Sequence, residues 1–241
     1  MFLRCTCLAL LFAALLSPAL AQEQKTDSPP KLKIVLVGDS TVTDKAGWGA
    51  AFAKLLRPSA ECVNHARGGA SSKSYYDSKL WKRALEQKPD YVLIQFGHND
   101  QPGKGPERET NPENTYREYL HKYIAEARAA GAKPILVTSL VRRTFTADGK
   151  INSSLAPYAK AMKAVAAETK TPLVDLHERS KELAERIGAE KSQAFGPPHP
   201  TQAGKFDGTH LNEQGAAQVA PLVVAELRKA DASLAPYLQS E

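Results

Sequence analysis

The stretch Ile34-Val35-Leu36-Val37-Gly38-Asp39-Ser40-Thr41 decides the fold of this chain. Its four consecutive apolar residues predict a strand that is buried on both faces, as in a parallel sheet. Gly38 interrupts the strand, and the three polar residues after it are types that cap helices or close turns. Ser40 therefore either caps a helix or takes part in a site, because open α/β sheets bind ligands just beyond the carboxyl ends of their strands.

Strands and helices alternate along the rest of the chain. Apolar stretches predict strands at residues 32–37, 61–64, 91–96, 134–138 and 173–175. Helical stretches are predicted at residues 47–56, 75–87, 113–130 and 212–229, with two more that end near Thr169 and at Ile187. The alternation predicts an α/β protein with a five-stranded parallel sheet between two layers of helices, a three-layer α/β/α flavodoxin-like fold. In that fold the strand order 2-1-3-4-5 places a ligand crevice between strands 1 and 3.

Two long loops are expected beside this crevice. Residues 100–112 are rich in glycine and proline, and residues 189–205 contain Gly196-Pro197-Pro198. Loops of this length in compact domains are usually functional and often build a binding cleft.

The first 21 residues have the features of a signal peptide. Arg4 supplies a positive charge, residues 8–16 are apolar, and Ala19-Leu20-Ala21 is a small-x-small cleavage site. The apolar run is too short to cross a bilayer. We therefore expect cleavage after Ala21 and a secreted or periplasmic protein that binds no membrane afterwards. The mature chain is expected to begin with a polar lead-in at residues 22–31, followed by a single domain at residues 32–241.

Cysteine content bears on disulfide formation, and charge bears on the possible binding partners. Cys62 is the only cysteine beyond the expected cleavage site, so the mature chain cannot form an internal disulfide. The net charge of +6 is spread along the sequence without a dense Lys/Arg run. This pattern argues against nucleic acid as a partner and is compatible with an acidic polysaccharide. We expect a monomer.

A nucleophile and a base are available for ester hydrolysis. In Asp207-Gly208-Thr209-His210 the aspartate precedes the histidine by three residues. This spacing lets Asp207 fold back to the imidazole and set its tautomer, which leaves the other ring nitrogen free for Ser40. Taken alone, the motif also fits a helix-capping aspartate followed by an unrelated histidine.

Candidate donors for an oxyanion lie near the same predicted strand ends. The backbone N–H of Ser40 is one, because the chain turns into a helix there. Gly69 follows Gly68 in a glycine-rich loop and permits close approach of a substrate, and Asn99 in Gly97-His98-Asn99-Asp100 offers a side-chain amide. Each motif alone also fits an ordinary turn, and only their coincidence favours a site.

In this combination the motifs resemble the SGNH, or GDSL, hydrolase superfamily and, within it, the rhamnogalacturonan acetylesterase-like branch. The family's four blocks carry Ser, Gly, Asn and His, and the chain shows them in order at Ser40, Gly69, Asn99 and His210. Residues 64–74 and 131–138 resemble the pectin-deacetylating branch. Ala70 departs from the arginine that branch members often have there, a difference that bears on substrate positioning and leaves the chemistry intact.

The resemblance implies an SGNH hydrolase fold and an exported serine esterase that removes acetyl groups from a plant cell-wall polysaccharide. Rhamnogalacturonan (pectin) is the first expectation, and acetyl xylan or a small acetylated sugar is the alternative. By the resemblance Ser40 is the nucleophile, His210 the base and Asp207 its orienter. No cofactor and no metal are expected, and the partner is an acetylated polysaccharide or oligosaccharide. Basic residues of the expected cleft loops either bind substrate carboxylates or are ordinary surface residues: Lys104, Arg108, Arg142, Arg143 and Lys205.

Two functions of other classes remain open. A metal-dependent phosphoesterase could use the potential ligands Asp39, His98, Asp100, Asp207 and His210, but it would leave Ser40 and Gly69 without a role. A carbohydrate-binding protein without catalysis would have no need for the complete set of esterase residues.

Overall fold

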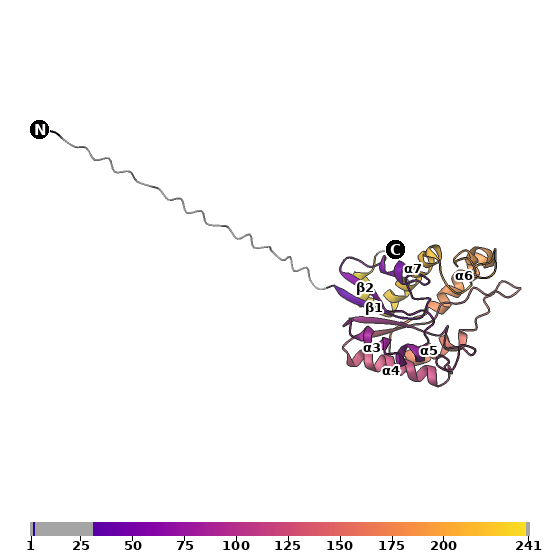
Figure 1. Ribbon diagram of the computed structural model, residues 1–241, viewed down its shortest axis with the longest axis horizontal. Coiled ribbons are helices and arrows are strands. Elements are labelled where there is room, and N and C mark those ends of the chain that lie inside the picture. Colours follow the sequence, from indigo (N-terminus) through magenta and orange to yellow (C-terminus); the bar gives the residue numbers. More distant parts are fainter. Residues whose placement is uncertain (1, 3–30, 240–241) are drawn as a thin grey trace. The chain divides into compact units, whose positions relative to one another are not determined.

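The computed structural model describes residue 2 and residues 31–239 (Figure 1). Except for residue 2, the expected signal peptide lies outside the described residues, as do its cleavage site and the lead-in up to residue 30. From Lys31 onward the chain forms one compact unit. In the part that is described, none of the helices combines the length and apolar character needed to cross a membrane.

A five-stranded, all-parallel sheet forms the centre of the molecule. Its strands are β1 (Leu32–Gly38), β2 (Ala60–Asn64), β3 (Tyr91–Gln95), β4 (Lys133–Val137) and β5 (Leu173–Val174). Their order is β2-β1-β3-β4-β5, so the predicted flavodoxin-like sheet is confirmed. Gly38 pairs in register with Gln95, which means that β1 and β3 end side by side. The segments that follow the two strands therefore leave the sheet at the same edge.

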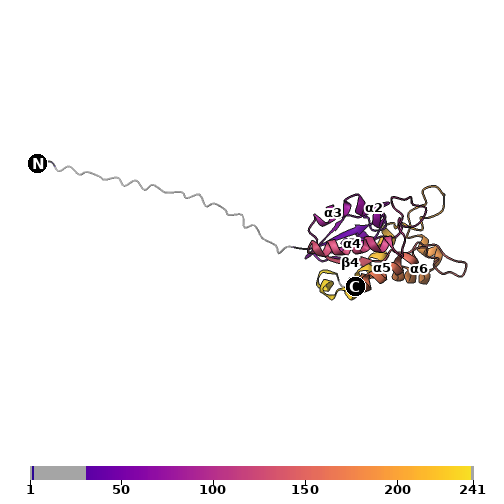
Figure 2. The same cartoon turned by 90° about the horizontal axis from the view of Figure 1, so that it is seen from below.

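Helices cover both faces of the sheet, because the side chains of the central strands alternate between two cores. Ile34 and Leu36 of β1 pack in one core, while Val35 and Val37 pack in the other. The first core contains residues of α1 (Gly49–Ala53), α6 (Leu176–Gln193) and α7 (Glu213–Ala230). The second contains residues of α2 (Ser72–Asp77), α3 (Leu80–Leu85), α4 (Thr115–Ala129) and α5 (Ala156–Thr169), the helices that lie over the face seen in Figure 2.

Several helix boundaries differ from the predicted ones. The stretch predicted as one helix at residues 75–87 is divided into α2 and α3, because Lys79 adopts a left-handed conformation with φ 64°. Gly188, with φ 83°, ends the regular part of α6 as predicted, but helical structure resumes and continues to Gln193. The predicted loop at residues 189–205 is therefore shorter. A 3₁₀ helix, η1 (Ala232–Tyr237), follows α7 and was not predicted.

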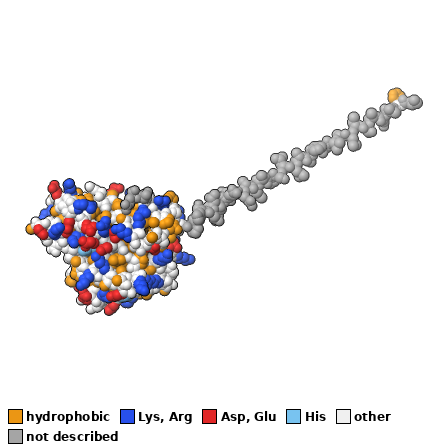
Figure 3. Space-filling model, turned by 180° about the vertical axis from the view of Figure 1, so that it is seen from behind, with side chains coloured by type: hydrophobic (Ala, Val, Ile, Leu, Met, Phe, Trp, Pro, Cys, Tyr) orange, Lys and Arg blue, Asp and Glu red, His pale blue; other side chains and the backbone are white. Residues whose placement is uncertain are grey.

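On the face shown in Figure 3, acidic and basic side chains are interspersed, and hydrophobic side chains are scattered among them. The charge of the chain is thus distributed on this face and does not gather in one basic patch.

A buried chain of hydrogen bonds shapes the turn after β1. The indole Nε1 of Trp48 donates to Oε1 of Gln95 (3.0 Å), and Nε2 of Gln95 donates to Oγ1 of Thr41 (2.7 Å). The Thr41 hydroxyl and backbone N–H both donate to Oδ1 of Asp39, at 2.7 and 2.8 Å. Since these side chains are buried, each bond also satisfies a polar group that has no access to water. The network fixes the backbone on both sides of Ser40.

Replacing Gln95 should destabilise the fold through this network. Gln95→Leu keeps most of the side-chain volume but removes the partners of Trp48 Nε1 and Thr41 Oγ1. We expect the free energy of unfolding to fall by about 1–3 kcal/mol, the cost of leaving a buried polar group unsatisfied. Urea denaturation of the variant measures it. The control Gln218→Leu, at an exposed position of α7, should change stability by less than about 0.5 kcal/mol, and equal effects of both would contradict the argument.

Candidate active site

Three side chains form a hydrogen-bonded chain at the carboxyl edge of the sheet. Oγ of Ser40 lies 2.8 Å from Nε2 of His210, and Nδ1 of His210 lies 2.7 Å from Oδ2 of Asp207. Ser40 follows β1, whereas Asp207 and His210 belong to the loop that precedes α7. The structure thus brings together the serine, the histidine and the aspartate that the sequence analysis selected.

The loop that carries the histidine is shaped by Asp207 itself. Its Oδ1 accepts hydrogen bonds from the backbone N–H groups of Thr209 (2.7 Å) and His210 (3.0 Å), which leaves Oδ2 for the imidazole. Burial acts to raise the pKa of Asp207, but the hydrogen bonds from His210 and from these two N–H groups lower it to about 2. An ionised carboxylate at Nδ1 keeps the proton on that nitrogen, so Nε2 is the acceptor that faces Ser40.

The loops of Ser40 and His210 are joined through backbone contacts. The N–H of Leu211 donates to the carbonyl of Ala46 (2.9 Å), directly linking the segment after His210 to the segment after Ser40. Asn212 then caps α7, because its side chain accepts from the N–H of Gly215 (2.9 Å). These bonds set the start of α7 and the position of the imidazole relative to Ser40.

The glycine-rich turn lies beside Ser40, and Asn99 is hydrogen-bonded to the residue after that turn. A Cβ built on Gly68 would lie 3.9 Å from Cβ of Ser40, and Gly69 is exposed with φ 76°, a conformation that favours glycine. The amide of Asn99 donates one hydrogen bond to the carbonyl of Ala70 (3.0 Å). This bond orients the side chain, and the second N–H of the amide remains for a ligand.

Two carboxylates and a histidine are buried in the segments that contain Ser40 and Asn99, and the sequence analysis considered them as turn or capping residues and as possible metal ligands. Oδ2 of Asp39 lies 3.4 Å from Nδ1 of His98, and both residues are buried. Burial acts to raise the pKa of Asp39, but the contacts with His98 and Thr41 bring it below its usual value. Burial raises the pKa of Asp100 to about 7, although Ser72 and Thr110 donate hydrogen bonds to it. The Asp100 bond to Ser72 ties the residue after Asn99 to the start of α2.

The potential metal ligands do not form one centre. Within residues 31–239, no three His, Cys, Asp or Glu side chains gather as ligands for an ion. Asp207 and His210 are paired with each other and with Ser40, and Asp39 and His98 form a separate buried pair.

The five basic residues predicted to bind substrate lie in different environments. Arg108 and Lys104 are half-buried in the loop after β3, and a Cβ built on Gly69 would lie 3.9 Å from Nη1 of Arg108. Arg142 donates to the carbonyl of His98 (3.2 Å) and to Oγ of Ser154 (3.1 Å). Lys205 is exposed.

Arg143 does not fit its predicted role. Its side chain is only 7% exposed, and Nη2 donates to the carbonyls of Asp207 (2.5 Å) and His210 (2.7 Å). The guanidinium is enclosed beneath the histidine loop and has no access to a substrate carboxylate. The sequence pattern contained no signal for this burial, because adjacent arginines in a polar loop are usually exposed.

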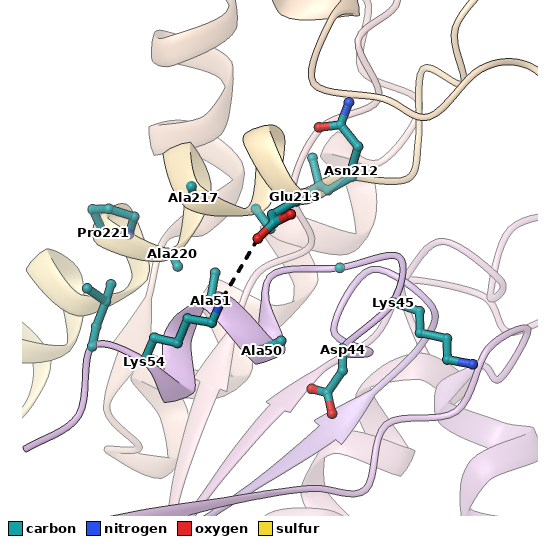
Figure 4. Close-up of a pocket in the computed structure, with 14 residues that line it drawn as sticks. Asp44, Lys45, Ala50, Ala51, Lys54, Asn212, Glu213, Ala217, Ala220 and Pro221 are labelled. Atoms are coloured by element: carbon teal, nitrogen blue, oxygen red, sulfur yellow. Dashed lines mark ion pairs between the residues drawn. The ribbon is translucent and has the colours of Figure 1, made fainter. Parts of the chain in front are cut away.

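A pocket of about 430 Å³ lies between α1 and α7, next to the same loops (Figure 4). One side is lined by residues that follow Ser40, including Asp44 and Lys45, and the other by residues that follow His210, including Asn212. Lys54, the residue after α1, points toward Glu213 at the start of α7, with Nζ 3.9 Å from Oε1. The pocket therefore extends from the two segments that carry the serine and the histidine.

Most of the chain matches a known protein family. Residues 36–218 match the family model described as GDSL-like Lipase/Acylhydrolase. The chain is 38% identical over 224 residues to the rhamnogalacturonan acetylesterase RhgT of Bacillus subtilis (strain 168). This alignment covers 87% of this chain and 95% of RhgT.

Solved structures share the fold. The crystal structure of YxiM from Bacillus subtilis aligns with a TM-score of 0.67 at 28% identity, covering 83% of this chain and 56% of that one. A variant of Axe2, an acetyl-xylooligosaccharide esterase from Geobacillus stearothermophilus, aligns with a TM-score of 0.63 at 19% identity, covering 82% and 94% of the two chains. At that identity the likeness to Axe2 shows a common fold alone.

The geometry of Asn99 leads to a kinetic prediction. If its free N–H meets an oxyanion, Asn99→Ala should lower kcat for an acetyl ester by about 10²–10³-fold, or about 3–4 kcal/mol, with KM little changed. Asn99→Asp should be at least as damaging, because a carboxylate repels an oxyanion. Steady-state kinetics checks both variants, and Asn152→Ala, at an exposed position, is the control. A raised KM with kcat intact would assign Asn99 to binding of the sugar instead.

Proposed function

Because this chain belongs to the GDSL-like lipase/acylhydrolase family, we propose that it is a serine esterase that removes acetyl groups from a plant cell-wall polysaccharide, with rhamnogalacturonan as its main substrate. The chain is a carboxylic ester hydrolase. The observation that carries the proposal is the hydrogen-bonded chain from Ser40 through His210 to Asp207, with the Gly68-Gly69 turn beside the serine and Asn99 bonded to the end of that turn.

In the proposed mechanism Ser40 Oγ attacks the acetyl carbonyl carbon while Nε2 of His210 takes the hydroxyl proton. The negative charge that develops on the carbonyl oxygen is stabilised by the N–H groups of Ser40 and Gly69 and by the Asn99 amide. The bond between the acetyl carbon and the sugar oxygen then breaks, and the imidazolium returns its proton to that oxygen. Water attacks the acetyl-enzyme with His210 again as base, which releases acetate and restores Ser40.

Asp207 supports both steps through the imidazole. Its carboxylate, with a pKa of about 2, is ionised throughout the neutral range and stabilises the imidazolium that forms in each step. The short contact between Nδ1 and Oδ2 also holds the ring in the plane that directs Nε2 at Ser40.

An acidic sugar is favoured over a neutral one by Arg108. Its guanidinium lies beside Gly69, at the expected position of the acetyl group, and within the described residues no carboxylate forms an ion pair with it. A galacturonate carboxylate next to the acetylated hydroxyl would provide one. The 38% identity to a rhamnogalacturonan acetylesterase supports the same substrate. Acetyl xylan, which is neutral, is the second candidate, and a small acetylated sugar the third.

We also propose that the enzyme is exported, as a monomer, to the periplasm or the medium. The composition of residues 1–21 supports export, and a polymeric substrate is available only outside the cell.

Acetate release from a panel of acetylated polymers tests the proposed function. We expect the fastest release from acetylated rhamnogalacturonan, slower release from acetyl xylan, and none from either with Ser40→Ala, whose circular dichroism should match the wild type. A serine-reactive phosphonate should label Ser40.

Exhaustive chelation should leave the rate unchanged, because the mechanism uses no metal. Loss of activity that a divalent ion restores, together with turnover by Ser40→Ala, would instead support the metal-dependent phosphoesterase.

The role of Arg108 is tested by comparing substrates. Arg108→Gln should lower kcat/KM on acetylated rhamnogalacturonan by about tenfold, since a charge-assisted contact at a partly exposed site contributes about 1–2 kcal/mol. The rate on acetyl xylan should stay within about twofold, and added salt should weaken only the wild-type preference for the acidic polymer. Arg83→Gln, at an exposed position of α3, is the matched control. An equal loss on both polymers would remove Arg108 from substrate selection.

A further inference from the structure

We infer that Arg143 is a positioning residue, which holds Asp207 and His210 at their working distances by binding the backbone carbonyls of both. The inference rests on the proposed roles of Asp207 and His210 in catalysis. It assigns to Arg143 a function different from the substrate contact that its sequence context suggested.

Arg143 binds three of the four carbonyl groups in the segment from Asp207 to His210. Its backbone N–H donates to the carbonyl of Gly208 (2.7 Å), while Nη2 donates to the carbonyls of Asp207 (2.5 Å) and His210 (2.7 Å). A single nitrogen thus joins the two ends of the segment. The distance between the backbone at Asp207 and the backbone at His210 determines how Asp207 Oδ2 meets His210 Nδ1, because both side chains are short.

The segment also packs closely against Gly196. A Cβ on Gly196 would lie 2.0 Å from the carbonyl oxygen of Asp207 and 2.7 Å from Nη2 of Arg143. The N–H of Asp207 also donates to the carbonyl of Pro197 (2.9 Å). The histidine loop is therefore in contact with both the Gly196-Pro197 backbone and the guanidinium, and little free space remains around the Asp207 carbonyl.

The positive charge of Arg143 is retained in this enclosed position. Burial lowers the pKa of the guanidinium to about 10, while the charge of Asp207 opposes that change, so the group is ionised at neutral pH. Nε and Nη1 are buried without hydrogen-bond partners in the described structure. Burying them has a cost, and the bonds of Nη2 to two carbonyls are the contacts that offset it. A residue kept only for packing would need no charge here.

Three variants separate positioning from general stability. Arg143→Met removes the charge and the carbonyl bonds at similar volume, and Arg143→Lys keeps the charge and one flexible donor group. We expect kcat on 4-nitrophenyl acetate to fall by about 10–100-fold in Arg143→Met, since misplacement of a catalytic group by about 1 Å has this effect, with KM within about twofold. Arg143→Lys should recover only part of the loss, and labelling of Ser40 by the phosphonate should slow in both variants, more in Arg143→Met than in Arg143→Lys.

The matched control is Arg128→Met. Arg128 also donates to a backbone carbonyl, that of Thr169 (2.9 Å), but it joins α4 to the end of α5 and does not touch the histidine loop. The Arg128→Met substitution should lower the melting temperature without changing kcat per folded molecule.

Each outcome decides the question. A folded Arg143→Met with kcat within about threefold of the wild type overturns the inference, as does a rate that falls only in proportion to the folded fraction. If Arg143→Met does not fold, Arg143→Lys decides. A reduced kcat at an unchanged melting temperature supports positioning, and a full kcat reduces Arg143 to a stability residue. Absence of esterase activity in the wild-type protein would contradict the proposed function and is distinguishable from all of these results.

Discussion

The parallel pairing of β1 with β3 is the interaction on which the candidate site depends. Gly38 lies opposite Gln95, so the segment that begins with Asp39 and Ser40 leaves the sheet next to the segment that contains Asn99. Gln95 then links the two strand ends through side-chain hydrogen bonds to Thr41 and Trp48. A shift of one residue in this register would reverse which side chains face each core and would separate Ser40 from Asn99. The hydrophobic cores on the two faces therefore determine the register, and the register determines the site.

Asp39 and Asp100 show how burial and hydrogen-bond partners determine whether a carboxyl group is ionised. Asp39 and Asp100 are both fully buried, but their pKa values shift in opposite directions. Asp39 faces His98 and two donor groups of Thr41, which favour its ionised form. Asp100 accepts hydrogen bonds only from neutral groups and lies near the charge of Asp39, so burial raises its pKa to about 7. Two buried negative charges near each other are costly. At neutral pH only Asp39 is fully ionised, because the pKa of Asp100 is raised to about 7.

The open side of the site suits a polymeric substrate. Gly68 and Gly69 are exposed, and Ser40 is only half-buried, so an acetyl group on a chain can approach without entering a closed cavity. The histidine loop is the more enclosed side, because Arg143 and Gly196 both pack against it. Rigidity is thus concentrated on the residues proposed to transfer protons, while the glycine turn leaves space for the sugar. Arg108, beside that turn, is the charged group that we propose distinguishes an acidic sugar from a neutral one.

The sequence by itself determined the features that short segments encode. Continuous apolar runs predict the buried central strands. The three-residue separation of Asp207 and His210 predicts their contact, because hydrogen bonds within one turn depend only on local backbone geometry. Only the tertiary structure decided the contact between Ser40 and His210, which lie 170 residues apart, and the positions of the two arginines. Arg108 and Arg143 are alike in sequence, each in a polar loop, yet one lies beside Gly69 and the other is buried under the histidine loop. Burial of a side chain depends on which distant segment packs over it, and no local pattern contains that information.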